Sequence, residues 1–436
     1  MSTAPPPPAA DAPLGPFAEL AAAARAVRHL DQRFWAPNIV FLLDGAAYFG
    51  ILNVLTLHLD GTLGLGESRT GQLVSFMTAL LTLAMVFLGP TVDKIGVRRS
   101  MTWTITASLL GRALLVAAPA LGGGLPVVVA GLALMAVGGG VLQTAVYAGV
   151  KQATDERTSA MGFSLIYALM NLGIVLESAA SSPVRAAWGT TGVLAMCTGL
   201  TAVYLLVHLV AFPKGAGEPV PAPVAKPGAP VLTWREHPLL DLRFLYFIFI
   251  LVGVRTLFAH QWLTMPDYVT RAFPEEVGAR FEWISGLNPL VIVIGTPLVA
   301  ALTRRVPVLT MMILGTGVSA LATLLLVPGP QLGMLLAYVV IFSIGEALWS
   351  SRFLEYVAEL APAEKVGVYM GLANVPWFLA KFTTGLYSGA MIAEFVPKGG
   401  PERSGTMWLA YTAIALSSPV GLLLARRWLS APRAAR

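Results

Sequence analysis

The chain has 436 residues, of which only 12% are charged, whereas about 25% are charged in a typical soluble protein. Hydrophobic residues make up 56% of the sequence, and the mean hydropathy is +0.72. This composition excludes an ordinary soluble enzyme and predicts a protein that crosses the membrane several times. The net charge is +6, but the basic residues stand in pairs and triplets between apolar runs, so we expect no nucleic-acid partner.

Signatures of several other protein classes are missing from the sequence. The glycine runs 122–124 and 138–140 are not followed by Gly-Lys-Ser/Thr, so neither forms the phosphate-binding loop of an ATP-driven pump. HExxH does not occur and no GxSxG lies in an apolar stretch, so we expect no enzyme and no catalytic residue. The single cysteine, Cys197, excludes an intrachain disulfide. We expect no metal and no cofactor.

Twelve stretches are apolar enough to cross a bilayer, which takes about 20 residues at roughly 1.5 Å of rise per residue. They cover approximately residues 37–58, 70–91, 101–120, 125–149, 160–182, 190–212, 241–262, 282–303, 307–329, 331–351, 366–392 and 406–428.

The proline-rich segment between the sixth and seventh spans excludes regular helix over most of its length. It divides the chain into six spans plus six, and the segment from Gly89 to Arg99 is echoed 206 residues later, as in duplicated transporter halves. The predicted parts are a cytoplasmic segment 1–36, a six-helix bundle 37–212, a cytoplasmic linker 213–240, a second six-helix bundle 241–430 and a cytoplasmic tail 431–436.

Lysine and arginine counts predict the orientation of the spans. If the N-terminus is cytoplasmic, the inner segments hold 19 of these residues and the outer segments hold six. Because positive charge stays on the cytoplasmic side, we expect both termini to be cytoplasmic in a multi-pass protein of the cytoplasmic (inner) membrane.

The loop after the second span has a distinctive spacing of glycine and charge, at Gly89, Asp93, Gly96, Arg98 and Arg99. The first glycine lets helices approach closely, the aspartate has Arg98 or a helix N-terminus as a partner, and the second glycine permits a tight turn. A short basic loop would explain the charges but not this spacing. The loop resembles the signature G-x-x-x-D-[RK]-x-G-x-[RK]-[RK] of the major facilitator superfamily, which implies an all-α fold of twelve transmembrane helices in two six-helix halves. We therefore expect these five residues to act in gating.

Four further segments are similar to the proton-dependent oligopeptide transporter family. The first span from Asp44 to Leu52 is similar to E-R-F-x-Y-Y-G-M-R, and the fifth from Ile166 to Gly173 resembles F-Y-x-x-I-N-x-G. Leu287 to Leu290 matches L-N-P-L, and Gly345 to Ala347 resembles G-E-L. The order and spacing of these pieces imply the fold of that family over most of the chain.

The departures from the family pattern fall on its working residues. The family pattern E-x-x-E-R-F has two proton-handling glutamates. In this chain the first position is Phe41, and only the second is acidic, as Asp44. The family's seventh-span acid maps to His260, just before the matching Gln261, and its fourth-span lysine maps to Gln143. The expected tenth-span partner of that lysine remains as Glu346. The resemblance therefore implies the fold, with the standard proton-coupling set only partly present.

Charged side chains inside spans are candidate functional residues, because each costs at least about 2.5–3.5 kcal/mol near the bilayer centre. Asp44 and Glu346 lie roughly 7–11 Å from the cytoplasmic boundary, so both are expected to be proton sites, with structural ion pairs as the alternative. Lys381 lies in mid-span and needs a counter-charge. It is the expected partner of Glu346, either in function or as a purely structural pair.

Three other charged residues of the spans, Arg112, Arg352 and Glu355, favour structural roles. Arg112 is expected to pack in the third span away from the cavity. Arg255 and His260 are about 140° apart around a helix, so at most one of them faces the cavity squarely. Arg352 and Glu355 are expected to form an ion network at the interface.

The candidate residues for substrate binding and proton coupling are Asp44, Tyr48, Gln143, Tyr167, Asn171, His260, Gln261, Asn288, Glu346 and Lys381. For the two tyrosines, a core or belt position is the alternative. We expect a monomeric secondary transporter that moves a small polar or amphipathic solute, peptide-like or related, by alternating access, with protons as the coupling ion and the lipid bilayer as its surroundings. The alternative is a non-transporting membrane sensor or scaffold on the same fold.

Overall fold

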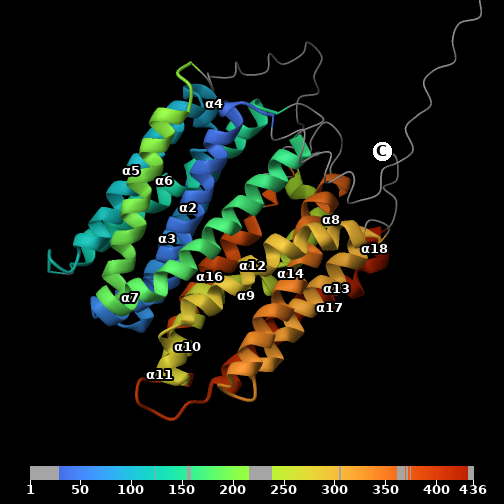
Figure 1. Cartoon of the computed structure of the whole chain (residues 1–436). Helices are drawn as coiled ribbons and strands as arrows, with labels where there is room; N and C mark the ends of the chain where they lie inside the picture. The colour runs from blue at the N-terminus through green and yellow to red at the C-terminus, as the bar shows by residue number, and fades with distance from the viewer. Residues whose placement is uncertain are drawn as a thin grey trace, which may run out of the picture.

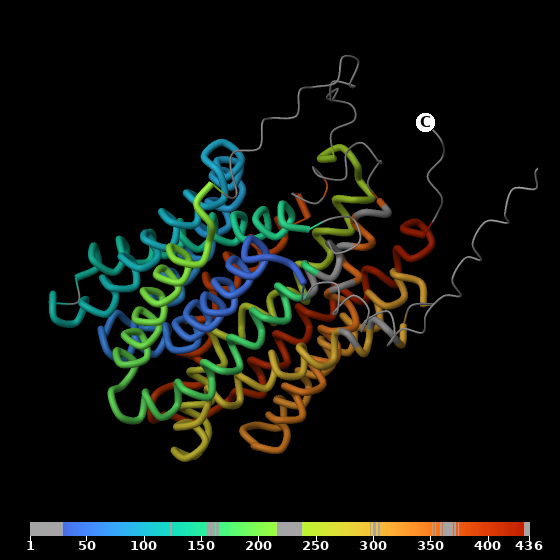
Figure 2. Tube along the Cα trace, turned by 45° about the horizontal axis from the view of Figure 1, so that its top comes forward, coloured from blue at the N-terminus to red at the C-terminus, as the bar shows by residue number. Residues whose placement is uncertain are grey.

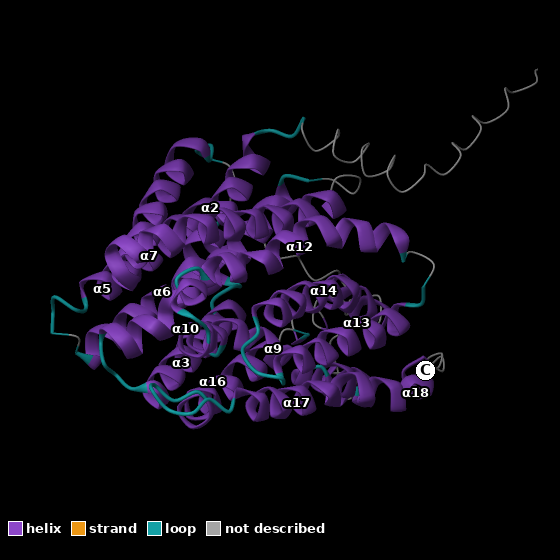
Figure 3. Ribbon diagram, turned by 60° about the horizontal axis from the view of Figure 1, so that its bottom comes forward, coloured by secondary structure: helices purple, strands orange, loops and turns teal. Residues whose placement is uncertain are grey.

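The computed structural model describes residues 29–122, 124–154, 159–215, 238–303, 306–360, 369, 372–373 and 375–430. Helices make up nearly all of these residues, and no strand occurs among them (Figure 3). The predicted linker lies almost wholly outside the described ranges, as do most of the N-terminal segment and the tail. The boundaries of these three parts therefore stay predictions.

The first half of the chain forms six helices and one short π-helical turn. They are α2 (Gln32–Leu57), η1 (His58–Thr62), α3 (Glu67–Phe87), α4 (Thr91–Ile95), α5 (Val97–Ala117), α6 (Leu125–Gln152) and α7 (Ser159–Ala211).

The second half forms ten helices and two short 3₁₀ turns among the described residues. They are η3 (Pro238–Leu240), α8 (Leu242–Ile250), α9 (Val252–Leu263), α10 (Met265–Ala272), α11 (Glu275–Gly278), α12 (Phe281–Leu302), α13 (Val308–Ala322), η4 (Thr323–Leu326), α14 (Leu332–Leu360), α16 (Val375–Phe395), α17 (Ser404–Leu424) and α18 (Arg426–Ser430).

The predicted spans coincide with these helices. Nine helical stretches of the described residues are long and apolar enough to cross a membrane, and one of them, Leu165–Ala211, holds two predicted spans. The eighth and eleventh predicted spans fall on α12 and α16. Large apolar side chains remain exposed on the outside of the bundle, as on Val210 (78%) and Leu424 (81%), where lipid replaces water. The all-α fold of twelve spans is confirmed.

The course of three spans differs in detail from the prediction. The helix of the fifth span continues through Pro183, and the chain reverses only at Gly189, whose φ of 65° suits glycine. The seventh span is broken at Leu251 into α8 and α9. The tenth runs to Leu360 instead of residue 351.

The two halves lie on either side of the molecule and meet along two seams (Figure 2). One seam joins α3 to α16 and the other joins α7 to α12. At the first seam, Ser75 donates to the carbonyl oxygen of Phe382 at 3.0 Å. A Cβ on Gly71 would lie 2.7 Å from the carbonyl oxygen of Gly385, so only glycine permits this approach. Helices α10 and α11 lie at one end of the bundle, which we call the α10 end. Helix α4 lies at the opposite end (Figure 1).

Candidate functional site

A buried carboxylate on α14 lies where three helices meet. Glu346 is only 7% exposed. The Nδ2 atom of Asn288 on α12 donates to Oε2 of Glu346 at 2.8 Å and lies 2.9 Å from Oγ of Ser343. Tyr167 on α7 of the other half is adjacent to the same carboxylate. The fold therefore brings together three of the predicted site residues, Tyr167, Asn288 and Glu346.

Three further candidates of the first half, Asn171, Gln143 and Tyr48, have contacts within that half. Asn171 lies one turn beyond Tyr167 on α7 and donates to its carbonyl oxygen at 2.9 Å. Gln143 on α6 is adjacent to Tyr147. The ring of Tyr48 lies edge-on to that of Phe49, with centroids 5.2 Å apart. No hydrogen bond joins these side chains to Glu346 among the described residues.

Asp44 lies in a different environment, inside the first half. Its Oδ1 atom is 3.0 Å from Nη2 of Arg112 on α5 and accepts a 2.8 Å hydrogen bond from the Tyr204 hydroxyl on α7. The other terminal nitrogen of Arg112 donates to Thr201 and Tyr204. Both charges are thus satisfied inside one half, an arrangement that matches the structural alternative for Asp44.

The two candidates on α9 face their own half. His260 is 1% exposed, and its ring stacks on Tyr411 with the centroids 3.7 Å apart. Its Nδ1 lies 2.8 Å from the Thr264 hydroxyl, and its Nε2 lies 3.1 Å from the Tyr387 hydroxyl. The Gln261 amide donates to the Tyr338 hydroxyl at 2.8 Å.

The ion pair expected between Lys381 and Glu346 does not form in this conformation. The ammonium of Lys381 lies 5.6 Å from the ring centre of Trp377 and 5.9 Å from that of Trp262. The carboxylate of Glu346 instead accepts a hydrogen bond from the side-chain amide of Asn288. The two residues were expected to meet because each needs a partner, but their helices direct them to different neighbours.

The loop between α3 and α5 has the geometry that its glycines predict. Gly96 has a φ of 87° and turns the chain from α4 into α5. A Cβ on Gly89 would lie 3.1 Å from the Thr144 hydroxyl on α6, so the loop lies close against that helix.

The charges of this loop do not pair with each other. Arg98 donates from Nε to the carbonyl oxygen of Phe212 and from Nη2 to that of Leu209, both at 3.2 Å, at the C-terminus of α7. Asp93 is exposed in the first turn of α4, where a negative charge is favoured. Of its two expected partners, the helix N-terminus is therefore present and Arg98 is not. Arg99 is exposed.

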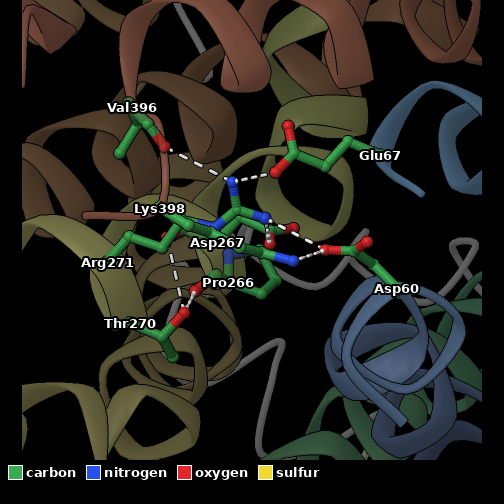
Figure 4. A network of polar contacts seen from close by, with 8 residues as sticks. All are labelled: Asp60, Glu67, Pro266, Asp267, Thr270, Arg271, Val396 and Lys398. Atoms are coloured by element: carbon green, nitrogen blue, oxygen red, sulfur yellow. Dashed lines mark hydrogen bonds and ion pairs between the residues drawn. The ribbon is translucent and has the colours of Figure 1, made fainter. Parts of the chain in front are cut away.

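An ion network at the α10 end was missed by the sequence analysis (Figure 4). Arg271 on α10 lies 2.6 Å from carboxylate oxygens of both Glu67 and Asp267, and 3.3 Å from Oδ2 of Asp60. Lys398 lies 2.6 Å from the same oxygen of Asp60. Because Asp60 and Glu67 belong to the first half and the other three to the second, the network joins the halves.

Burial and charge act in opposite directions on one acid of this network. Asp267 is 6% exposed, and burial raises its pKa above the usual range of an aspartate. The adjacent positive charge of Arg271 counteracts that rise.

A second ion pair joins the halves at the same end. Arg185 on α7 forms an ion pair with Glu282 on α12, and its Nη2 donates to the carbonyl oxygen of Gly278 at 2.7 Å. Ser182 also donates to Glu282, at 3.1 Å. The sequence analysis counted Arg185, like Arg271 and Lys398, only as an orientation signal. Acidic residues at the same ends of the spans were the signal that would have indicated these pairs.

Comparison with known proteins matches this architecture. Residues 38–385 match the family described as the Major Facilitator Superfamily. No curated relative matches the sequence. A peptide transporter POT in complex with sulfate is similar in structure, with 18% identity, a TM-score of 0.75, and coverage of 94% of this chain and 98% of that one. A POT family transporter in complex with 5-aminolevulinic acid has 15% identity and a TM-score of 0.70, covering 91% of this chain and 96% of that one. The transporter PepTSo has 15% identity and a TM-score of 0.71, covering 91% and 98%.

Proposed function

The chain belongs to the major facilitator superfamily, and on that premise we propose that it is a proton-coupled secondary transporter of a small polar or amphipathic organic solute. Secondary transporters built from two such halves bind substrate near the membrane midplane and expose it to each side in turn. Peptide-like molecules are the first candidates, since the similar structures include peptide transporters and one transporter complexed with 5-aminolevulinic acid.

The observation that carries this proposal is the position of Glu346. Its carboxylate is buried, accepts a hydrogen bond from Asn288 on α12 and is adjacent to Tyr167 on α7. Protonation removes its negative charge and turns one of its oxygens into a donor, so its contacts with both halves change together. A change of about 1.4 kcal/mol between two conformations shifts their ratio tenfold, so one proton at this position suffices to bias the transport cycle.

The ion network gives this cycle a gate. The positive-inside pattern favours placing the α10 end outside and both termini in the cytoplasm, in the cytoplasmic (inner) membrane. Arg271, Arg185 and Lys398 then hold the two halves together on the outer side. On this assignment the described conformation is closed to the outside, and outward opening has to separate these ion pairs.

Uptake by purified protein in liposomes tests the proposal. Radiolabelled di- and tripeptides, amino acids and small organic acids are supplied outside, with and without an acid-outside pH gradient. We expect saturable uptake of at least one solute and an increase in its rate with the gradient. A protein that binds a solute of the panel but moves none would be a sensor or scaffold.

A further inference from the structure

Two cations of the second half lie against the same group of aromatic rings. The guanidinium carbon of Arg255 on α9 is 4.3 Å from the ring centre of Phe353 and 4.8 Å from that of Trp377. The ammonium of Lys381 on α16 is 5.6 Å from the ring centre of Trp377. Two further tryptophans, on α9 and α14, complete a group that we call the aromatic box: Arg255, Trp262, Trp349, Phe353, Trp377 and Lys381.

The positive charge of the aromatic box has no counter-charge among the described residues. Arg255 is 1% exposed and is close enough to Lys381 for the two charges to repel each other. Neither cation forms an ion pair with any residue that the structure describes. Their charged groups lie against the faces of aromatic rings instead. Glu346 lies one turn before Trp349 on α14, but its carboxylate is bonded to Asn288. The attraction between a cation and an aromatic ring face is weaker than the attraction between a cation and a desolvated anion.

The unsatisfied polar atoms of the aromatic box are all donors. Nε and Nη1 of Arg255 are buried without a hydrogen-bond partner in the described ranges, and so are the indole nitrogens of Trp262 and Trp349. Each of these groups has N–H to donate and no capacity to accept. Buried donors of native proteins are normally satisfied, so this position lacks an acceptor. The adjacent positive charges favour a negatively charged one.

We infer that the aromatic box binds the anionic group of the transported solute, an organic carboxylate, phosphonate or sulfonate with an apolar body. The planar guanidinium of Arg255 suits two oxygens of such a group, Lys381 adds a point charge, and the indole rings pack against the body. Trp262 also lies edge-on to Phe49 of the first half, with centroids 6.4 Å apart, so the occupant lies beside the meeting of the halves. This inference rests on the proposed transport function.

Binding to purified protein in neutral detergent tests the chemistry of the occupant. The probes are phenylphosphonate and 3-phenylpropionate, with neutral 3-phenylpropanamide and inorganic sulfate as comparisons, and tryptophan fluorescence is the readout. We expect at least one aromatic anion to bind tenfold or more tightly than both comparisons. Arg255→Gln and Lys381→Gln should each weaken that binding at least tenfold, whereas Arg69→Gln, the same change at an exposed position, should leave it unchanged. Absence of binding by both aromatic anions, equal binding of either comparison, or unchanged binding in both box variants would overturn the inference.

A second measurement needs no ligand. If the two cations lack a counter-charge in the empty protein, Lys381→Met and Arg255→Met should each raise the unfolding temperature, because an apolar side chain fits the ring-lined position without buried charge. A lower unfolding temperature in both variants would mean that the cations hold the fold and would overturn the inference even where a glutamine variant fails to fold.

Failure of the site and failure of transport are distinguishable. Uptake in liposomes that is equal for an anionic solute and its neutral amide would leave the transporter intact and remove the anion site. Tight anion binding in detergent with no flux in liposomes would keep the binding residues and reject the transport function on which the solute assignment rests.

Discussion

Asp44 and Arg112 form an ion pair, with 3.0 Å between Oδ1 and Nη2, on two helices of the same half. Glu346, the other intramembrane acid singled out by the sequence, bonds to an amide and has no cation beside it in the part of the chain that the structure describes. The first acid is neutralised by partners of its own half, whereas the second lies beside residues of both halves. From this difference we expect Asp44 to stabilise the first half, and we propose that Glu346 couples the two halves.

Breaking the Asp44 pair from one side should destabilise the protein. Asp44→Asn leaves Arg112 buried without a counter-charge, and we expect a loss of about 3–5 kcal/mol in the free energy of unfolding. The double variant Asp44→Leu/Arg112→Leu should recover most of that loss, since it removes both charges. Glu355→Gln, which breaks an exposed pair with Arg352, is the control and should cost less than about 1 kcal/mol. A double variant as unstable as Asp44→Asn would contradict this interpretation.

Removing Arg271 should open the α10 end. Spin labels at Gly61→Cys and Glu276→Cys, both exposed and on opposite halves, report the separation of the halves when Cys197 is replaced by serine. We expect Arg271→Gln to shift the label distances toward longer values, because it removes the two ion pairs that join this arginine to the first half. Arg403→Gln, whose pair with Glu394 lies within one half, should leave the distances unchanged.

The same labels should reveal a pH dependence of closure. Burial raises the pKa of Asp267 in the closed state, and opening returns it toward the solvated value of about 3.9. The closed state therefore binds the proton more tightly, and closure is favoured as pH falls through the raised pKa toward the solvated value. At pH values above the raised pKa this contribution is lost. We expect shorter distances at lower pH and no such response in Asp267→Asn; longer distances in the unaltered protein at lower pH would show that the sign is wrong.

Lys381 and Glu346 should act independently on stability. Since no ion pair joins them in this conformation, the effects of Glu346→Gln and Lys381→Met on the free energy of unfolding should add within about 0.3–0.5 kcal/mol. A coupling energy well above that range would mean that the two charges interact directly.

The positions of the helices could be predicted because the length of an apolar run sets where the chain crosses the bilayer. The turn at Gly189 was harder to place, since residues 183–188 continue the helix beyond the apolar run. Sequence spacing does identify Gly96 as a tight turn, because it lies between the basic residues Lys94 and Arg98 and short-range geometry decides its conformation.

Pairings between helices could not be predicted in the same way. Asp44 and Arg112 are both recognisable as costly charges, but they lie 68 residues apart, and only packing shows that they face each other. Lys381 is recognisable as a costly charge in the same way, but it lies against aromatic rings and not beside an acid. The network around Arg271 was missed because its basic members were interpreted by topology alone, without the acids at the same depth.

The most direct test of the account is pH-driven uptake into liposomes by the Glu346→Gln variant, compared with Glu355→Gln on the same helix. If Glu346 carries the coupling proton, its variant should bind the transported solute but lose the increase in uptake rate caused by an acid-outside gradient, and the Glu355 variant should retain that increase. An undiminished increase in Glu346→Gln would contradict the central claim.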